Sequence, residues 1–315
     1  MKVAILDDYQ NVALDMADWS AVANRAEITV FNDHVPDLDA VVDRLRPFDV
    51  VCVMRERTPL PREVIERLPR LKLIASTGRR NASIDLAAAE ERGIRVAATG
   101  YSATSTVEMT WALILASARN IVRESNSIRG GGWQTALGWE LHGNVLGVLG
   151  LGNIGTQVAR IGRAFGMNII AWSQNMTPEI AAAAGATLVT KEELFARSDA
   201  VTIHLVLSKR TRGLVGAAEL ALMKPTSRLI NTSRGPIVDE AALIQVLQSG
   251  AIAGAALDVF DNEPLPVGHP LRTLPNVLAT PHIGFVAEGL YRTFYGDMAA
   301  NVAAWLDDQA NDRAK

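Results

Sequence analysis

The sequence has little cysteine, little net charge and no long apolar run, and each shortage excludes a class of protein. Its 315 residues contain one cysteine, Cys52, so neither an internal disulfide nor a cysteine-based metal cluster can form. Thirty-one basic and 34 acidic side chains give a net charge of −3, which argues against nucleic-acid and anionic-membrane partners. The longest apolar stretch, around "MTWALILASA", is too short to span a bilayer. We therefore expect a cytoplasmic protein with no metal site.

Short β-rich runs alternate with helical patterns, and the alternation occurs twice. The first series is "KVAIL", "ITVF", "DVVCVM", "LKLIAST" and "IRVAAT". The second, after residue 144, is "VLGVLG", "NIIAW", "AVTIHL", "RLINTS", "AGAALDVF" and "VLATPH". Such alternation is typical of parallel sheets covered by helices on both faces. The sequence therefore predicts an α/β protein with two doubly wound parallel-sheet domains.

Two helices set the expected domain boundaries. One long helix is predicted over residues 104–122, with Ser or Thr at its cap and Glu108 in its early turns, and a loop follows at 129–133. A last helix near 287–308 follows the final strand and can return to the first domain in such folds. We expect residues 1–101 plus 287–315 to form a substrate domain and residues 102–286 to form a dinucleotide-binding domain.

A glycine motif opens the second series. Gly150, Gly152 and Gly155 stand in "GLGNIG", which follows a predicted strand and begins a predicted helix. In this motif the first glycine permits a tight turn, the second lets the backbone approach a pyrophosphate, and the third lets the helix lie close to the strand. The amides at the start of the helix, including those of Asn153 and Ile154, then point at the phosphates. The context predicts a dinucleotide site.

The next strand, "NIIAW", ends without the acidic residue that usually binds the adenosine ribose. Ser173 stands there, followed by Gln174 and other uncharged polar residues. Without a carboxylate, nothing repels the 2′-phosphate of NADP, and without Arg or Lys nothing strongly attracts it. The cofactor is therefore expected to be NAD or NADP.

Four further stretches carry a family resemblance: "STGRRNASIDL" (76–86), "NTSRGPIVDE" (231–240), "ALDVFDNEP" (256–264) and "TPHIGF" (280–285). Their order along nearly the whole chain resembles that of the D-isomer-specific 2-hydroxyacid dehydrogenases, which include glyoxylate/hydroxypyruvate reductases and phosphoglycerate dehydrogenases. The resemblance implies a flavodoxin-like substrate domain and a Rossmann cofactor domain. It also implies NAD(P)-dependent reduction of a small 2-oxo acid in a cleft between the domains.

Three residues match the family's catalytic positions. Arg234 matches the arginine that holds the substrate carboxylate and polarises the ketone, and a planar guanidinium suits that task. His282 matches the proton donor, and Glu263 matches the carboxylate that orients this histidine. Hydride transfer to a 2-oxo acid requires both a cation and an acid. Each of the three follows a predicted strand, at the edge where ligands bind in open α/β sheets.

Other positions match cofactor contacts of the family. Asp258 matches the acid that binds the nicotinamide carboxamide, and Gly284 leaves room beside the ring. His204 is interpreted either as a cofactor contact or as a strand-end histidine without a role. The remaining matched positions are Thr106, Leu205, Thr211, Thr232 and Ser233.

The first domain departs from the family pattern in its substrate loop. The family's second glycine is replaced by Arg80, next to Arg79. The backbone amides from Thr77 through Gly78 to Arg80 are still expected to hold a carboxylate. The two arginines either reach a second anionic group or are solvated. Arg55 is expected to line the same pocket, whereas its neighbour Arg57 is expected at the surface.

Two other functions remain open. A nucleotide-sensing binding protein on this fold can retain all three catalytic residues, so only the absence of turnover would favour it. A formate dehydrogenase usually carries a Gln where this chain has Glu263, which counts against that activity. The family also implies a homodimer through the nucleotide domain, with "IVRESNSIRGGGW" as a contact segment.

Overall fold

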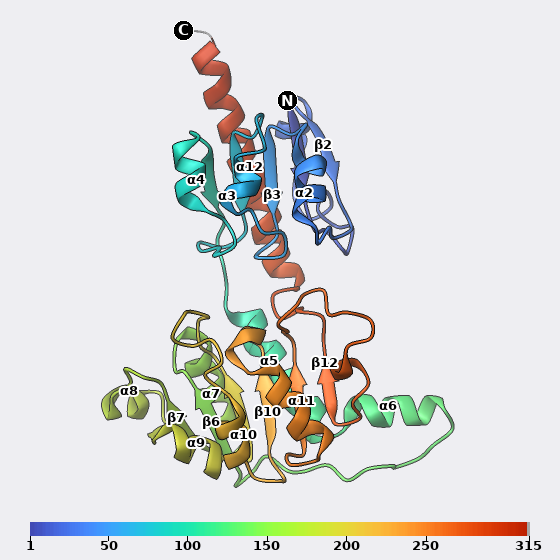
Figure 1. The fold of residues 1–315 in the computed structure, drawn as a ribbon, viewed down its shortest axis with the longest axis vertical. Helices are drawn as coiled ribbons and strands as arrows, with labels where there is room; N and C mark the ends of the chain where they lie inside the picture. Colours follow the sequence, from blue (N-terminus) through green and yellow to red (C-terminus); the bar gives the residue numbers. More distant parts are fainter. Residues whose placement is uncertain (314–315) are drawn as a thin grey trace. The chain divides into compact units, whose positions relative to one another are not determined.

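The computed structural model describes residues 1–313, and the chain divides into two compact units (Figure 1). Unit 1 comprises Met1–Ser102 and the segment that begins at Val286. Unit 2 comprises Ala103–Phe285. Each unit is built around its own parallel sheet, so the predicted fold class is confirmed.

Unit 1 holds a five-stranded parallel sheet in the order β2-β1-β3-β4-β5, which is the flavodoxin-like order. Every strand follows a predicted run. The two strands β3 and β4 are buried at every residue, which explains their unbroken apolar sequences. The strands are β1 (Lys2–Ile5), β2 (Glu27–Val30), β3 (Val50–Val53), β4 (Leu73–Ser76) and β5 (Arg95–Ala98).

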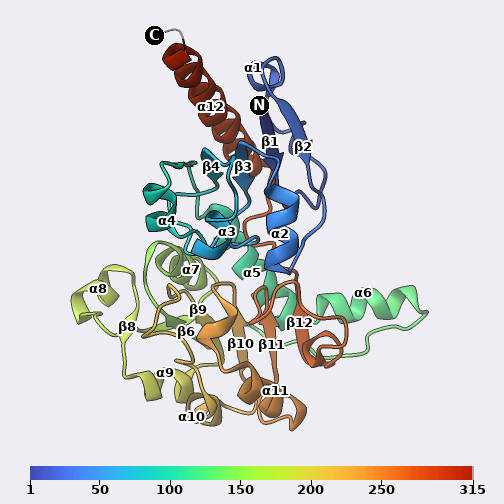
Figure 2. The same ribbon diagram turned by 45° about the horizontal axis from the view of Figure 1, so that its top comes forward.

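Helices cover both faces of this sheet. On one face lie α2 (Leu38–Leu45), α3 (Arg62–Ile65) and α4 (Leu86–Glu91), as Figure 1 shows. On the other lie α1 (Ser20–Ala23) and α12 (Glu288–Arg313), which contact each other. The predicted last helix is thus present and extends to Arg313 (Figure 2). It contacts β4 and β5 of the sheet.

Unit 2 holds a seven-stranded parallel sheet in the order β12-β11-β10-β9-β6-β7-β8. The order reverses between β6 and β9, which is where open α/β sheets bind ligands. Six strands follow predicted runs, whereas β8 was missed because two residues are too few to produce a pattern. The strands are β6 (Val145–Leu149), β7 (Asn168–Trp172), β8 (Thr187–Leu188), β9 (Ala200–Ile203), β10 (Arg228–Asn231), β11 (Gly254–Leu257) and β12 (Val277–Ala279).

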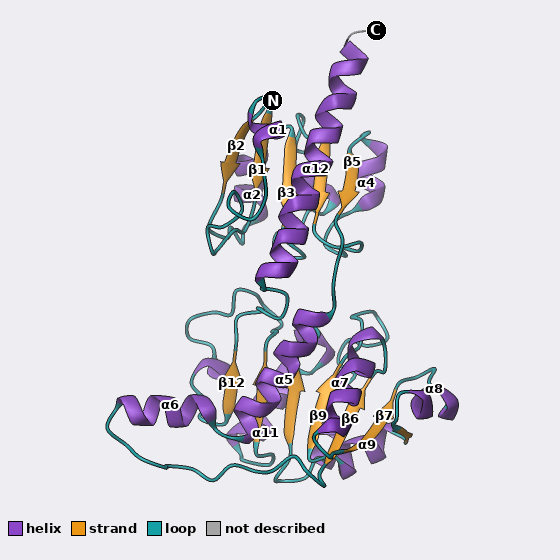
Figure 3. Cartoon of the chain, turned by 180° about the vertical axis from the view of Figure 1, so that it is seen from behind, coloured by secondary structure: helices purple, strands orange, loops and turns teal. Residues whose placement is uncertain are grey.

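The helices of unit 2 form two layers around the sheet (Figure 3). One layer contains α5 (Thr104–Ala118) and α7 (Asn153–Ala164), which pack together. The other contains α9 (Lys191–Arg197), α10 (Ala217–Leu222) and α11 (Glu240–Gln248). The remaining elements are α6 (Ile121–Arg129), α8 (Pro178–Ala183) and the 3₁₀-helices η1 (Gly235–Ile237) and η2 (Pro270–Arg272).

The prediction of a single helix over residues 104–122 with a Ser or Thr cap is wrong in two respects: the segment forms two helices, and no side chain caps the first one. The helix α5 ends at Ala118, and Asn120 adopts a left-handed conformation (φ 52°) that starts α6 as a separate helix. Asparagine tolerates this conformation, and an apolar pattern that continues past it does not reveal the break. The residue before α5 is Ala103, and no side chain caps the helix. Within residues 1–313, no helix is both long and apolar enough to cross a membrane.

Candidate functional site

The strand β6 runs into a glycine loop that opens α7. Gly150 has a φ of 101°, and a Cβ there would lie 2.8 Å from the carbonyl oxygen of His204. A Cβ at Gly155 would lie 2.0 Å from the carbonyl oxygen of Gly150, whereas one at Gly152 would meet nothing within 4 Å. No side chain caps α7, which begins at Asn153. The loop therefore offers space and backbone donors for a pyrophosphate.

Two alanine substitutions separate the roles of these glycines. Gly155→Ala is expected to destabilise the fold by about 1–3 kcal/mol, because its methyl group meets a backbone carbonyl that cannot move freely. Gly152→Ala is expected to retain the wild-type Tm but to weaken dinucleotide binding, because its methyl group fills open space. Thermal unfolding and a fluorescence titration with NADH measure the two effects. Equal losses of Tm in both variants would contradict this division of roles.

The end of β7 lies beside the glycine loop. The amide of Gly150 donates to the carbonyl oxygen of Trp172 at 2.9 Å. Ser173 is the next residue along the chain and therefore lies close to the glycine loop. Ser173 is partly exposed and Gln174 is exposed. The backbone carbonyl of Ser173 closes a turn with the amide of Met176 at 3.1 Å. The site thus presents uncharged donors and acceptors at the position of the missing carboxylate.

His204 follows β9 and borders the same loop. Its Nε2 lies 2.9 Å from Oγ1 of Thr202, and burial lowers the pKa of His204 to about 3. Burial therefore favours the neutral form of the ring, which brings no positive charge to a phosphate. Thr211 closes the turn that follows: its hydroxyl donates to the carbonyl oxygen of Val206 at 2.7 Å and accepts from the amide of Ser208 at 2.8 Å.

Hydroxyl groups connect the ends of β9 and β10 with α5. The hydroxyl of Ser233 donates to the carbonyl oxygen of Leu205. The hydroxyl oxygens of Thr232 and Thr110 lie 2.8 Å apart, and Thr110 also donates to the carbonyl oxygen of Thr106 at 2.8 Å. These bonds join four residues matched to cofactor contacts in two sets: Ser233 with Leu205, and Thr232 with Thr106 through Thr110.

Asn231, at the end of β10, shapes the turn that presents Arg234. Its buried side chain donates to the carbonyl oxygen of Arg234 and accepts from the amide of Ser233, both at 3.0 Å. The half-buried guanidinium of Arg234 donates to the carbonyl oxygen of Ser233 at 2.7 Å. The sequence interpretation missed Asn231, although asparagine commonly stabilises turns through such bonds.

The loops after β11 and β12 bring Glu263 and His282 together. Oε2 of Glu263 lies 2.5 Å from Nδ1 of His282, and its Oε1 accepts from the amide of Phe260 at 2.9 Å. The side chains of Glu263 and His282 are 31% and 21% exposed, so solvent screens the pair only in part. With Nδ1 facing the carboxylate, Nε2 is the nitrogen that can face a substrate.

A buried carboxylate holds the loop that carries His282. Oδ1 of Asp258 accepts from the hydroxyl of Thr280 at 2.6 Å and from the amide of Ile283 at 2.9 Å, and Oδ2 accepts from the amide of Gly284 at 2.7 Å. Burial raises the pKa of Asp258, while these hydrogen bonds oppose the rise. His282 itself adopts a left-handed conformation with φ 51°. Asp258 therefore stabilises the strained turn in which His282 stands.

In unit 1, the carboxyl ends of β3 and β4 hold Arg55 in a fixed position. Arg55 has a φ of 54°; its amide donates to Oγ1 of Thr77 at 2.7 Å, and its guanidinium donates to the carbonyl oxygen of Thr77 at 3.0 Å. The guanidinium also lies 5.5 Å from the ring centroid of Tyr101. Gly78 has a φ of 76°, a left-handed conformation that favours glycine, and a Cβ there would also displace this guanidinium.

Fewer backbone amides between Thr77 and Arg80 are available for a substrate carboxylate than the sequence suggested. The amide of Thr77 donates to a carbonyl oxygen of β3 at 3.2 Å, and that of Gly78 donates to Oγ1 of Thr99 at 2.8 Å. Two of the four amides are therefore already bonded. The amides of Arg79 and Arg80 donate to no acceptor in the described part of the chain, and both side chains are exposed.

The expectation that Arg57 lies at the surface is wrong. Arg57 is partly buried: it donates to the carbonyl oxygen of Asp7 at 2.9 Å and lies 4.5 Å from the ring centroid of Tyr9. The buried carboxylate of Asp7 accepts from the hydroxyl of Thr58 at 2.6 Å and lies 3.2 Å from Nδ1 of His34. These contacts connect the loop after β3 to the loop after β1 and so fix its position.

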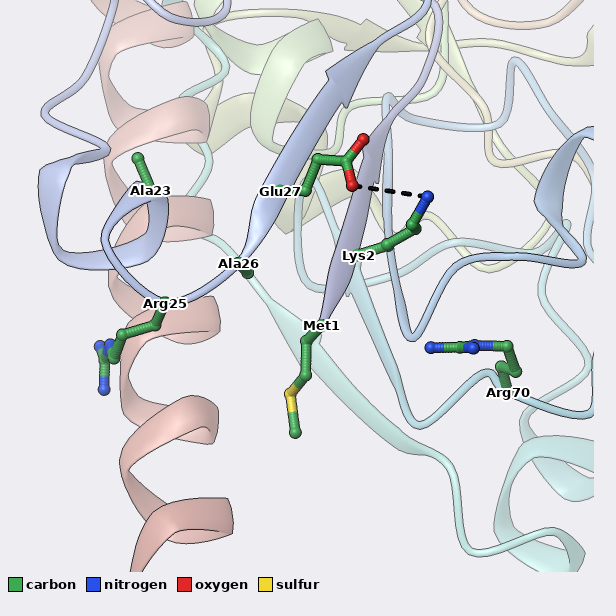
Figure 4. A pocket seen from close by; sticks show the side chains of 7 residues that line it. All are labelled: Met1, Lys2, Ala23, Arg25, Ala26, Glu27 and Arg70. Carbon is green, nitrogen blue, oxygen red and sulfur yellow. Dashed lines mark ion pairs between the residues drawn. The ribbon is translucent and has the colours of Figure 1, made fainter.

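A hollow of about 470 Å³ lies at the opposite edge of the sheet of unit 1 (Figure 4). Its lysine and arginine side chains are paired: Lys2 lies 3.4 Å from Glu27, Arg70 lies 3.1 Å from Asp49, and Arg25 pairs with Asp307. It borders the amino ends of β1 and β2, whereas ligands of open α/β sheets bind at the carboxyl ends. We therefore do not assign it a ligand. Among residues 1–313, no group of three or more His, Cys, Asp or Glu side chains could hold a metal ion.

The fold and the site of unit 2 are typical of dinucleotide-dependent dehydrogenases. Residues 111–284 match the model of the family described as "D-isomer specific 2-hydroxyacid dehydrogenase, NAD binding domain". The chain therefore belongs to the D-isomer-specific 2-hydroxyacid dehydrogenase family and is an NAD-dependent oxidoreductase of that family. The family resemblance noted in the sequence is confirmed.

Named relatives show how far the similarity extends. The D-3-phosphoglycerate dehydrogenase of Methanocaldococcus jannaschii is 40% identical over 280 residues, which are 84% of this chain and about half (53%) of the relative. The glyoxylate reductase of Aeropyrum pernix is 44% identical over 230 residues, 70% of this chain and 69% of the relative. The crystal structure of phosphoglycerate oxidoreductase from Vibrio cholerae is 38% identical, with a TM-score of 0.92 over 98% of this chain and 99% of that one.

Proposed function

We propose that the protein transfers a hydride between a nicotinamide cofactor and a small 2-oxo or D-2-hydroxy acid of the glyoxylate or hydroxypyruvate type. The observation that supports this most strongly is the Glu263–His282 pair at 2.5 Å, which follows the carboxyl ends of two strands in the nucleotide-binding unit. Relatives named glyoxylate reductase support the substrate class. The test is glyoxylate reduction by the wild-type chain and by His282→Asn.

The residues of unit 2 fit a dinucleotide. The open space at Gly152 and the uncapped amides of Asn153 and Ile154 suit a pyrophosphate. The polar end of β7 at Ser173 and Gln174 suits the adenosine ribose. When bound, the reduced nicotinamide supplies a hydride to the carbonyl carbon of the substrate.

The side chains of this chain then bind the substrate and move one proton. Arg234 binds the substrate carboxylate and polarises the carbonyl group, which stabilises the developing alkoxide. His282 donates the proton from Nε2 to that oxygen, so the carbonyl group that has received the hydride becomes an alcohol and the histidine becomes neutral. Glu263 accepts from Nδ1 and holds the ring in the orientation that directs Nε2 toward the substrate.

The cofactor choice depends on Ser173, because NADP is neither repelled nor strongly attracted there. Ser173→Asp is expected to weaken NADPH binding by about tenfold or more, since a carboxylate repels the 2′-phosphate, and to maintain or improve NADH binding. Asn168→Asp, at the other end of β7, adds the same charge away from the ribose position and serves as the control. Titration of both cofactors measures the effect, and equal NADPH affinities in all three proteins would contradict the ribose assignment.

The basic loops of unit 1 provide candidate groups for binding the substrate. We propose that Arg55 and the amides of Arg79 and Arg80 bind the substrate carboxylate. The exposed side chains of Arg79 and Arg80 would suit a second anionic group, so a substrate with two acidic groups is compatible with the loop.

We also propose a homodimer through unit 2. The helix α6 buries none of its residues, and Ile121, Val122 and Ile128 on it are 52%, 46% and 56% exposed. Trp133, in the following loop, is 75% exposed. This apolar surface suits burial against a second copy of the chain.

A further inference from the structure

A second histidine–carboxylate pair lies outside the residues matched to family positions. Nε2 of His269 lies 3.0 Å from Oε1 of Glu240, and each of these two side chains is 17% exposed. Nδ1 of His269 accepts from the amide of Leu271 at 3.4 Å, at the start of η2. Because Nδ1 is an acceptor, Nε2 carries the hydrogen that Glu240 accepts. The pair thus has a defined direction: histidine donates and carboxylate accepts.

Glu240 also binds the other end of the same loop. Its Oε2 accepts from the amide of Asp261 at 3.3 Å. One carboxylate at the start of α11 therefore holds the chain at Asp261 and again at His269. Glu263 lies between these two attachment points.

The start of this loop packs tightly against Gly235 and has little freedom to move. A Cβ at Gly235 would lie 2.0 Å from the carbonyl carbon of Phe260 and 2.6 Å from the amide nitrogen of Asp261, so backbone packs directly on backbone. The small cavity beside this contact has a volume of about 10 Å³ and is bordered by Gly235, Glu240 and Leu271. Phe260 in turn donates its amide to Glu263 at 2.9 Å. The loop position therefore determines where the Glu263 carboxylate lies.

From this geometry we propose that Glu240 is a positioning residue for the reaction. It holds both ends of the 261–269 loop through Asp261 and His269, and so keeps Glu263 in contact with His282. The inference rests on the proposed function of Glu263 and His282. Glu240 itself acts through the loop and contacts neither of those two side chains in the structure.

The test compares Glu240→Ala and Glu240→Gln with wild type, alone and combined with Glu263→Gln. We expect Glu240→Ala to lower kcat for glyoxylate reduction about tenfold with an unchanged KM for the cofactor, as is typical when a support of a functional side chain is removed. Glu240→Gln retains one acceptor oxygen and should lose less. Glu193→Gln is the matched control, because Glu193 likewise accepts a backbone amide at a helix start, from Thr190 at 2.9 Å.

The double variants distinguish positioning from general stability. If Glu240 acts through Glu263, Glu240→Ala lowers kcat no further in the Glu263→Gln background. Wild-type kcat in Glu240→Ala, or an undiminished additional loss in that background, would overturn the inference. If Glu240→Ala does not fold, Glu240→Gln and His269→Gln carry the same comparison. Failure of the proposed function gives a different result: His282→Asn would then be as active as wild type.

Discussion

Arg234→Ala is expected to lower kcat/KM for 2-oxo acid reduction by about 10³-fold. The guanidinium is assigned two tasks, since it binds the substrate carboxylate and stabilises the negative charge that develops on the carbonyl oxygen. The side chain of Asn231 holds the backbone of this turn through the carbonyl oxygen of Arg234 and the amide of Ser233, both at 3.0 Å, so the turn has support besides the arginine side chain. Steady-state kinetics with glyoxylate measure the loss, and the Tm should stay near that of wild type.

Two matched variants control this prediction. Arg234→Lys keeps the charge but loses the planar fork, so it should recover only part of the activity. Arg79→Ala removes an exposed arginine of unit 1 and should change substrate preference at most. Equal and mild effects of Arg234→Ala and Arg79→Ala would contradict the role assigned to Arg234.

His282→Asn is expected to lower kcat by about 10² to 10⁴-fold, the range of general acid catalysis, with little change in cofactor affinity. Asparagine tolerates the left-handed backbone (φ 51°) that His282 adopts, so the loop held by Asp258 should persist. The diagnostic measurement is the split between two constants: kcat for glyoxylate reduction should fall, while the Kd for NADH, measured by fluorescence titration, should stay near that of wild type.

Glu263→Gln provides the companion measurement. The glutamine retains the size of the side chain but not the negative charge that faces Nδ1 of His282. We therefore expect kcat for glyoxylate reduction to fall, but less than in His282→Asn, because the histidine ring is still present. A His282→Asn variant with the wild-type kcat would show that another group supplies the proton.

The fold could be predicted closely from the sequence because short β-rich runs alternate with helical patterns, and eleven of the strands follow such runs. Central strands such as β3 and β4 are buried at every residue and therefore give continuous apolar runs. The failures have local causes. The two residues of β8 produce no pattern, and the break between α5 and α6 depends on the conformation of Asn120 alone.

The candidate site was predictable where a local motif carries its own chemistry, as the glycine loop does. The pairing of Glu263 with His282 was expected only from the family resemblance, and the structure places the two side chains in contact. The supporting residues were not predictable, because their roles depend on contacts between distant parts of the chain. Glu240 stands 21 positions before Asp261 and 29 before His269, and no local pattern connects them. Asp258 was matched only to a cofactor contact, although it also holds the turn at His282.

The most direct test of the proposed function is the initial rate of glyoxylate reduction, with NADH and with NADPH each titrated. Oxidation of at least one cofactor that depends on glyoxylate, and that His282→Asn abolishes almost completely, is the predicted result. The ratio of the two rates would show which cofactor the Ser173 region accepts. Tight binding of cofactor with no turnover of glyoxylate, hydroxypyruvate or a 2-oxo diacid would contradict the proposal and would favour a nucleotide-sensing protein.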